Sequence, residues 1–126
     1  MKQRLLILAA AVVALTFLSG PVIAHHGGAA FDQSQTLTFS GTVTQLEFAN
    51  PHVLVYFDIT KDGATEKWSG WLTAPNKLAR AGWTKRTLVP GDKIAIAGTP
   101  HKGGSHILQV RKLAGPDGKD LPLSEN

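Results

Sequence analysis

The spacing of hydrophobic positions changes near residue 25. Leu5 to Leu18 form an apolar run of 14 residues that only Thr16 interrupts, whereas apolar and polar residues alternate over short stretches further along. The run is shorter than the roughly 20 residues that a membrane-spanning helix needs. Lys2 and Arg4 precede it and the helix-breaking Ser19-Gly20-Pro21 follows it, which is the order of parts in a secretory signal.

The segment Val22-Ile23-Ala24 ends in the small residue that signal cleavage requires. We therefore predict that residues 1–24 are a cleaved secretory signal and that a periplasmic chain begins at His25. The alternative is an uncleaved membrane anchor. After cleavage we expect no stable insertion into a membrane.

Alternating stretches rich in Val, Ile, Thr and aromatic residues predict β-strands in the remaining chain. A change of phase in the first stretch predicts a bulge or bend near Gly41, and Asp62-Gly63 is a hairpin turn signal. One helical stretch covers 74–81, where Pro75 suits the first turn and Gly82 the C-terminal cap. The predicted strands cover residues 36–49, 53–60, 65–73, 93–98 and 105–113.

Three strands, a short helix and two strands follow one another in the order of the OB-fold, a small barrel that binds oligonucleotides and oligosaccharides. We predict a mainly β protein, a five-stranded OB-like barrel with one short helix between strands 3 and 4. Another small β-sandwich or a half-open barrel is the alternative. The predicted organisation is an N-terminal arm at 25–35, the barrel at 36–115 and a polar C-terminal tail at 116–126.

Composition narrows the classes of partner. Removing residues 1–24 leaves 102 of the 126 residues, enough for one small domain. The formal charge of +4 includes Lys2 and Arg4, so the processed chain carries +2. This charge and the absence of a basic run argue against nucleic acid as a partner. Since the chain has no cysteine, a metal site would use histidine, carboxylate or the terminal amine.

Five histidines are the main candidates for chemistry, and all lie at the chain start, in predicted loops or at a strand edge. His25 and His26 would open the processed chain, and His52 follows the first strand. His101 lies in the loop between the last two strands, and His106 begins the last strand. In an OB-like barrel the loops that carry His52 and His101 flank one face, so we expect the two imidazoles near each other.

Cleavage before His25 would place a free amine beside an imidazole, and these two groups can chelate one metal ion. A third nitrogen from His52 or His101 would give an arrangement resembling the histidine brace of copper proteins. His26 offers another mode, in which the amine, an amide nitrogen and its imidazole bind together. Both modes suit Cu(II) better than Zn(II) or Ni(II). We predict a copper site at His25, His26, His52 and His101, with solvated, metal-free histidines as the alternative.

Aromatic residues and the absence of catalytic motifs leave a second hypothesis open. Trp68 and Trp71 are three positions apart and face opposite sides of a regular strand, so we expect Trp83 and one of this pair in the core. Exposed Trp71 or Tyr56 beside a groove would favour a metal-free module that binds a small molecule, a glycan or a protein. No nucleophile motif or paired acid and base appears in the sequence, so we do not expect an enzyme.

Several short motifs occur together along the chain. They are His25-His26, the Asn50-Pro51-His52 turn, the segment from Pro75-Asn76 through Leu78 and Arg80 to Gly82-Trp83, and Pro90-Gly91-Asp92. Together they resemble a family of small exported bacterial proteins of unknown function. The resemblance implies export and a single β-rich domain, and it places His25, His26 and His52 at positions of the family pattern. It implies no activity.

Overall fold

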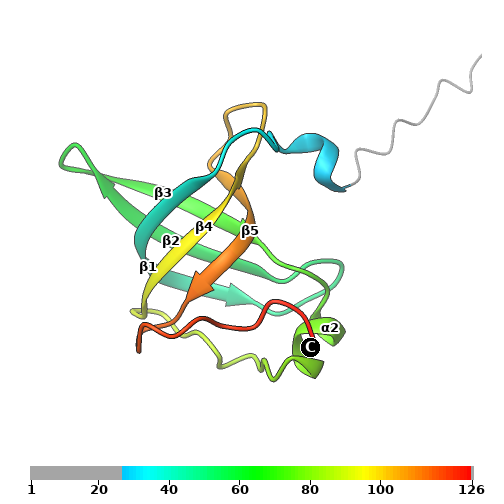
Figure 1. The fold of residues 1–126 in the computed structure, drawn as a ribbon. Helices are drawn as coiled ribbons and strands as arrows, with labels where there is room; N and C mark the ends of the chain where they lie inside the picture. The colour runs from blue at the N-terminus through cyan, green and yellow to red at the C-terminus, as the bar shows by residue number, and fades with distance from the viewer. Residues whose placement is uncertain (1–26, 126) are drawn as a thin grey trace, which may run out of the picture.

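Five strands form a closed barrel in the computed structural model, which describes residues 27–125 (Figure 1). Around the barrel the strands follow the order β1-β2-β3-β5-β4, and only β3 and β5 pair in parallel. This confirms the predicted OB-like barrel. The elements are η1 (Gly27–Ala30), β1 (Leu37–Glu47), β2 (Leu54–Lys61), β3 (Ala64–Trp71), α2 (Pro75–Arg80), β4 (Lys93–Pro100) and β5 (Ile107–Ala114).

The long first strand serves two neighbours. Its first half pairs with β4 and its second half with β2. The register shifts between Val43 and Gln45, a few residues past Gly41, where the sequence predicts a bulge or bend. Gly41 itself is buried, and a Cβ atom at this position would lie only 2.8 Å from the Phe57 ring. The absence of a side chain at Gly41 therefore makes room for the core.

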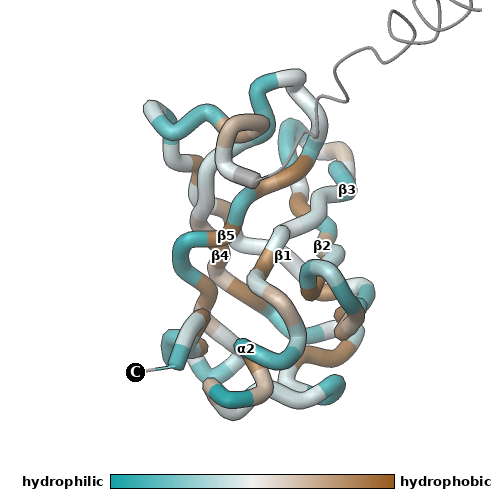
Figure 2. Tube along the Cα trace, turned by 90° about the vertical axis from the view of Figure 1, so that its right-hand side faces the viewer, coloured by the Kyte–Doolittle hydropathy of each residue, from teal (hydrophilic) through white to brown (hydrophobic). Residues whose placement is uncertain are grey.

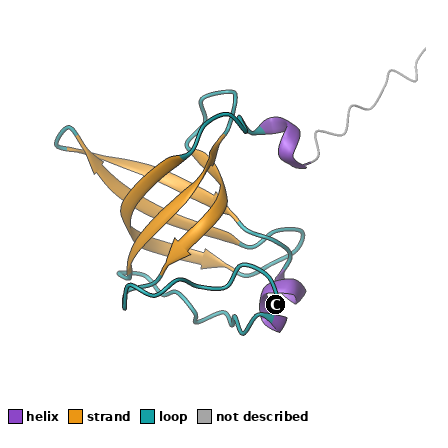
Figure 3. Ribbon diagram, in the orientation of Figure 1, coloured by secondary structure: helices purple, strands orange, loops and turns teal. Residues whose placement is uncertain are grey.

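The turn between β2 and β3 is formed by Asp62-Gly63, as the sequence predicts. The φ angles of these residues are 53° and 77°, the positive values that a tight hairpin turn of this type requires. The β2–β3 hairpin extends beyond the rest of the barrel (Figure 3).

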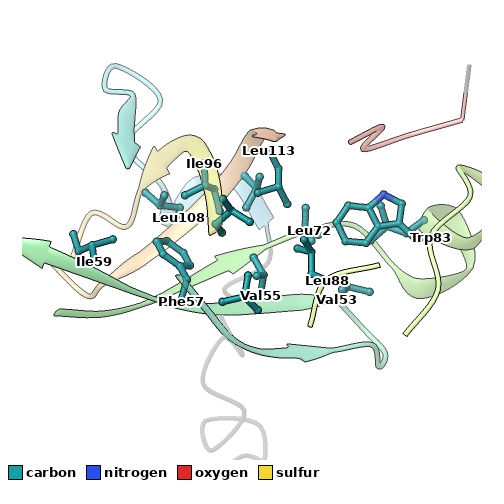
Figure 4. Packing of buried hydrophobic residues seen from close by; sticks show 14 residues of the cluster. Val53, Val55, Phe57, Ile59, Leu72, Trp83, Leu88, Ile96, Leu108 and Leu113 are labelled. Carbon is teal, nitrogen blue, oxygen red and sulfur yellow. The ribbon is translucent and has the colours of Figure 1, made fainter. Parts of the chain in front are cut away.

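Buried side chains of β1, β2, β4 and β5 fill the barrel, and the partly buried Trp68 of β3 packs against them. The core continues toward α2, where Leu78 belongs to the same cluster. Phe57, Ile96 and Leu108 come from three strands and meet inside the barrel (Figure 4). Buried and more exposed positions alternate along β2 and β4, because successive side chains point to opposite faces of a sheet. Figure 2 shows how hydrophobic residues are distributed along the chain of the barrel.

The helix α2 closes one end of the barrel. Leu78 is fully buried, and Gly82 follows the helix with a φ of 96°, the left-handed value common after a helix C-terminus. Trp83 is buried, as predicted, and its indole N–H donates to the Pro122 carbonyl at 2.7 Å. Leu121 packs against the core, so the predicted C-terminal tail lies along this end of the barrel.

The loop of residues 101–106 and the N-terminal arm lie at the other end of the barrel (Figure 1). Within residues 27–125, no helix has the length and apolar character needed to cross a bilayer.

Candidate functional site

The predicted copper ligands divide into two groups. His25 and His26 lie outside the described residues, so their part of the prediction is untested. His52 and His101 lie on a continuous row of aromatic rings. The order of rings is His52, Trp71, Phe31 and His101, with centroid separations of 5.4, 5.7 and 5.8 Å. The two imidazoles therefore lie at opposite ends of this row, separated by two rings, and they line different grooves.

The imidazole of His52 is held in one orientation. It stacks on the Trp71 ring with an interplanar angle of 22°, and its Nδ1 lies 3.1 Å from the Leu72 carbonyl oxygen. Because a carbonyl only accepts, Nδ1 carries the proton and donates it. In the neutral ring the Nε2 lone pair is then available, and His52 is exposed. A backbone carbonyl fixes metal-binding histidines in the same way.

The imidazole of His101 has the opposite arrangement. Its Nδ1 accepts a hydrogen bond from the Gly103 backbone N–H at 3.0 Å, so the neutral ring carries its proton on Nε2. Coordination through Nε2 would move that proton and break the hydrogen bond, at a cost of about 1 kcal/mol. Of the two described candidates, His52 is therefore the better prepared ligand.

Phe31 fixes the described part of the arm, residues 27–35, to the barrel. Its side chain is buried, with 1% of its surface exposed. Two backbone hydrogen bonds flank it, from the Asp32 N–H to the Pro100 carbonyl at 2.8 Å and from the Lys102 N–H to the Ala30 carbonyl at 2.9 Å. The arm thus pairs with the start of the 101–106 loop.

A polar network ties the start of the arm to β5. The Gln33 side-chain amide donates to the Gly28 carbonyl and to Gln109 Oε1, both at 3.2 Å. The Arg111 guanidinium donates to Gln33 Oε1 at 2.8 Å and to Gln109 Oε1 at 2.9 Å. Gln109 and Arg111 also line a groove of about 250 Å³ with His52. Gly28, near the start of the described part of the arm, is therefore linked to the residues that line this surface. We call this surface the His52 groove; Phe31, Trp71 and Thr73 also line it.

Asp32 stabilises the turn that leads from the arm into β1. The Ser34 hydroxyl donates to its carboxylate at 2.6 Å, the Ser34 N–H donates at 3.1 Å, and the Gln35 amide donates at 2.7 Å. These bonds, first of all that from the Ser34 hydroxyl, lower the pKa of Asp32 below 3.8. The contribution to stability is complete above the unfolded value and is lost as pH falls through the lowered pKa.

A second aromatic cluster surrounds Trp68, one of the three tryptophans that the sequence offers either as core residues or as a stacking surface. His106 stacks on Trp68 at a centroid distance of 4.6 Å and an angle of 8°, and the Trp68 indole N–H donates to Glu66 Oε2 at 3.0 Å. The alternation Glu66-Lys67-Trp68 places the carboxylate and the indole on one face, but the approach of His106 follows from the pairing of Ser69 with Ile107. A sequence signal for that parallel register is lacking.

The described residues contain no group of three or more His, Asp or Glu side chains arranged to hold a metal ion. A site within residues 27–125 would therefore need further ligands. The sequence offers His25, and the terminal amine that cleavage would create, as such ligands.

Comparisons with known proteins give a family and no activity. No curated protein matches the chain. The model of a family of unknown function, DUF6152, matches residues 12–109, which is more than half of the chain. The match covers β1 to β4 and reaches into β5, and it includes every histidine discussed above. The chain belongs to the DUF6152 family of unknown function.

Proposed function

We propose that this protein is exported to the periplasm, loses residues 1–24, and binds Cu(II) through His25 and His52. The amine and imidazole of His25 would supply two nitrogens, and Nε2 of His52 a third. Such a nitrogen set suits Cu(II) best among the common divalent ions. The protein would act as a copper-binding module and not as an enzyme.

The observation that carries this proposal is the tautomer of His52. Its Nδ1–H donates to the Leu72 carbonyl at 3.1 Å and its ring stacks on Trp71. The imidazole is thus oriented without any metal, and its lone pair belongs to an exposed ring. Holding a ligand in its bound orientation reduces the entropy lost on binding.

The position of the arm supports a role for His25. Gly27 is two residues from His25 in the sequence, so their Cα atoms lie within about 7 Å of each other. The next residue, Gly28, is linked through Gln33 to Gln109, which lines the His52 groove. The two-residue separation would therefore allow the amine of His25, created by cleavage, to approach this groove.

His26 and His101 have lesser roles in this proposal. Binding through the amine, an amide nitrogen and the His26 imidazole would leave His52 unused, so it is the competing copper mode. His101 would join only after losing the hydrogen bond from Gly103. In either mode the amine must be unprotonated, so affinity should fall as pH drops through the usual amine pKa of about 7.7–8.0.

Replacing His52 with alanine should weaken Cu(II) binding by about 100-fold, because loss of an inner ligand should cost at least as much as the 10–100-fold of an outer-shell partner. Titration of the processed chain with Cu(II), in competition with a chelator of known affinity, measures this. The Trp71 ring contacts His52, so Cu(II) should also quench its fluorescence. A Trp71→Phe variant should lose most of that quenching.

The matched control is His106→Ala, which removes another exposed imidazole that stacks on a tryptophan. It should leave Cu(II) affinity unchanged. Equal losses in both variants, or none in His52→Ala, would remove His52 from the site. Retained tight binding in His52→Ala would favour the His26 mode, and weak binding by all variants would favour a metal-free module that binds a small molecule, glycan or protein.

A further inference from the structure

A second groove lies at the end of the barrel opposite α2, and His101 is among its lining residues. It encloses about 430 Å³, within the usual range for ligand pockets. We call it the mouth groove; its lining includes Phe39, Lys61, Glu66, Trp68, Lys102 and His106. These residues come from three strands and from the 101–106 loop, so the groove exists only in the closed barrel.

A carboxylate occupies an inward-facing position at this mouth. On β3, Glu66 and Trp68 share the face of Gly70, which is buried against core side chains. The Glu66 side chain is 25% exposed and accepts the Trp68 indole N–H at 3.0 Å. Since partial burial of a carboxylate is costly, a barrel that needed only stability would favour an apolar residue here. The indole holds the carboxylate in a fixed position.

A flat platform lies next to this carboxylate. The Trp68 ring packs against Phe39 at 4.6 Å and against His106 at 4.6 Å, the latter nearly parallel. The His106 side chain is 49% exposed, so the platform ends in a ring that is open to solvent. Aromatic surfaces of this kind bind the apolar face of a ring-shaped ligand.

The charges around the groove compensate one another. Glu66 lies 4.0 Å from Lys61 and 3.9 Å from His106, and Asp32 and Lys102 line the same groove. Two carboxylates would repel a phosphate or another anion. Two lysines already balance those carboxylates, so a cationic ligand gains little. The groove therefore offers hydrogen-bond acceptors on its carboxylates and hydrogen-bond donors on its lysines, next to a flat apolar surface.

We propose that the mouth groove binds a neutral saccharide, with one sugar face on the solvent-exposed face of the His106 ring, which stacks on Trp68, and its hydroxyl groups bonded to Glu66 and the neighbouring lysines. A sugar ring offers the matching pattern, since its faces carry C–H groups and its edge carries hydroxyls. This groove and the His52 groove share no lining residue.

The test is NMR titration of the ¹⁵N-labelled processed chain with maltotetraose and, separately, chitotetraose, in the presence of EDTA. The Trp68 indole signal, assigned from a Trp68→Phe variant, should shift on addition of at least one sugar, and that of Trp83 should not. Glu66→Gln keeps the size of the side chain and an acceptor for the indole. This variant and His106→Ala should each weaken binding at least 10-fold, whereas Trp71→Phe should leave it unchanged.

An unchanged Trp68 signal at the solubility limit of both sugars would overturn the proposal. Unaltered affinity in His106→Ala, or an equal response to a nucleoside, would also overturn it. Because EDTA removes copper, this result is independent of the copper titration, and either proposal can fail alone.

Discussion

Truncation of Phe31 to alanine is expected to release the arm and to accelerate amide hydrogen exchange at Asp32 and Lys102 by about 100-fold or more. Removing a buried phenylalanine side chain costs about 3–5 kcal/mol, and Phe31 is buried against Trp71 and His101. The exchange rates of these two amides measure release of the arm directly, because the amides donate the backbone hydrogen bonds on either side of Phe31.

Amide hydrogen exchange in the barrel distinguishes local release of the arm from unfolding of the whole domain. Phe31 lies outside the main cluster of core residues, so amides in the β2–β3 hairpin should change far less than those of the arm. Phe31→Leu serves as the control, since it keeps most of the apolar volume and should cause a smaller effect. Equal acceleration throughout would mean that Phe31 supports the whole barrel. No acceleration would mean that other contacts hold the arm.

Replacement of Gly98 with alanine is expected to cost about 3 kcal/mol, the upper end of the usual range for overpacking. Gly98 lies at the register shift between β4 and β5. A Cβ atom there would collide with the Gln109 carbonyl and lie 2.9 Å from its carbon. Backbone atoms cannot rotate away, so β5 must move. Urea denaturation followed by circular dichroism measures the loss.

The matched control for this variant is Gly115→Ala, at another buried glycine where the nearest atom would be 3.6 Å from the new Cβ. It should change stability by less than 1 kcal/mol. Because Gln109 also joins the network that ties the arm to β5, Gly98→Ala should weaken copper binding as well. If Gly98→Ala and Gly115→Ala were equally stable, β5 would be able to move away from the new Cβ atom without loss of folding free energy.

Local patterns in the sequence were sufficient to predict the barrel. Alternation identifies the strands, Asp62-Gly63 forms the predicted turn, and Pro75 and Gly82 bound the helix. The bulge in β1 lies close to Gly41, as the change of phase predicts, but a glycine inside a strand has two explanations. At Gly41 the reason is the proximity of the Phe57 ring, a contact between strands that the local sequence does not encode.

The candidate site could be predicted only in part for the same reason. The strand order predicts that His52 and His101 lie near each other, but it does not predict the two rings that separate them. One of these rings, Phe31, comes from the arm and contacts Trp71 and His101, and no periodic pattern marks it as buried. The choice between the two imidazoles depends on which backbone group each Nδ1 contacts, and that information exists only in the folded chain.

The copper site, as proposed, is created by removal of residues 1–24. The decisive measurement is the Cu(II) affinity of the chain that begins at His25 compared with a chain that carries Gly-Ser before His25. The extension keeps every side chain but moves the terminal amine away from the His25 imidazole. We expect affinity to fall by about 100-fold, equivalent to about 2.7 kcal/mol. Affinities that agree within about threefold, or about 0.6 kcal/mol, would contradict the proposal.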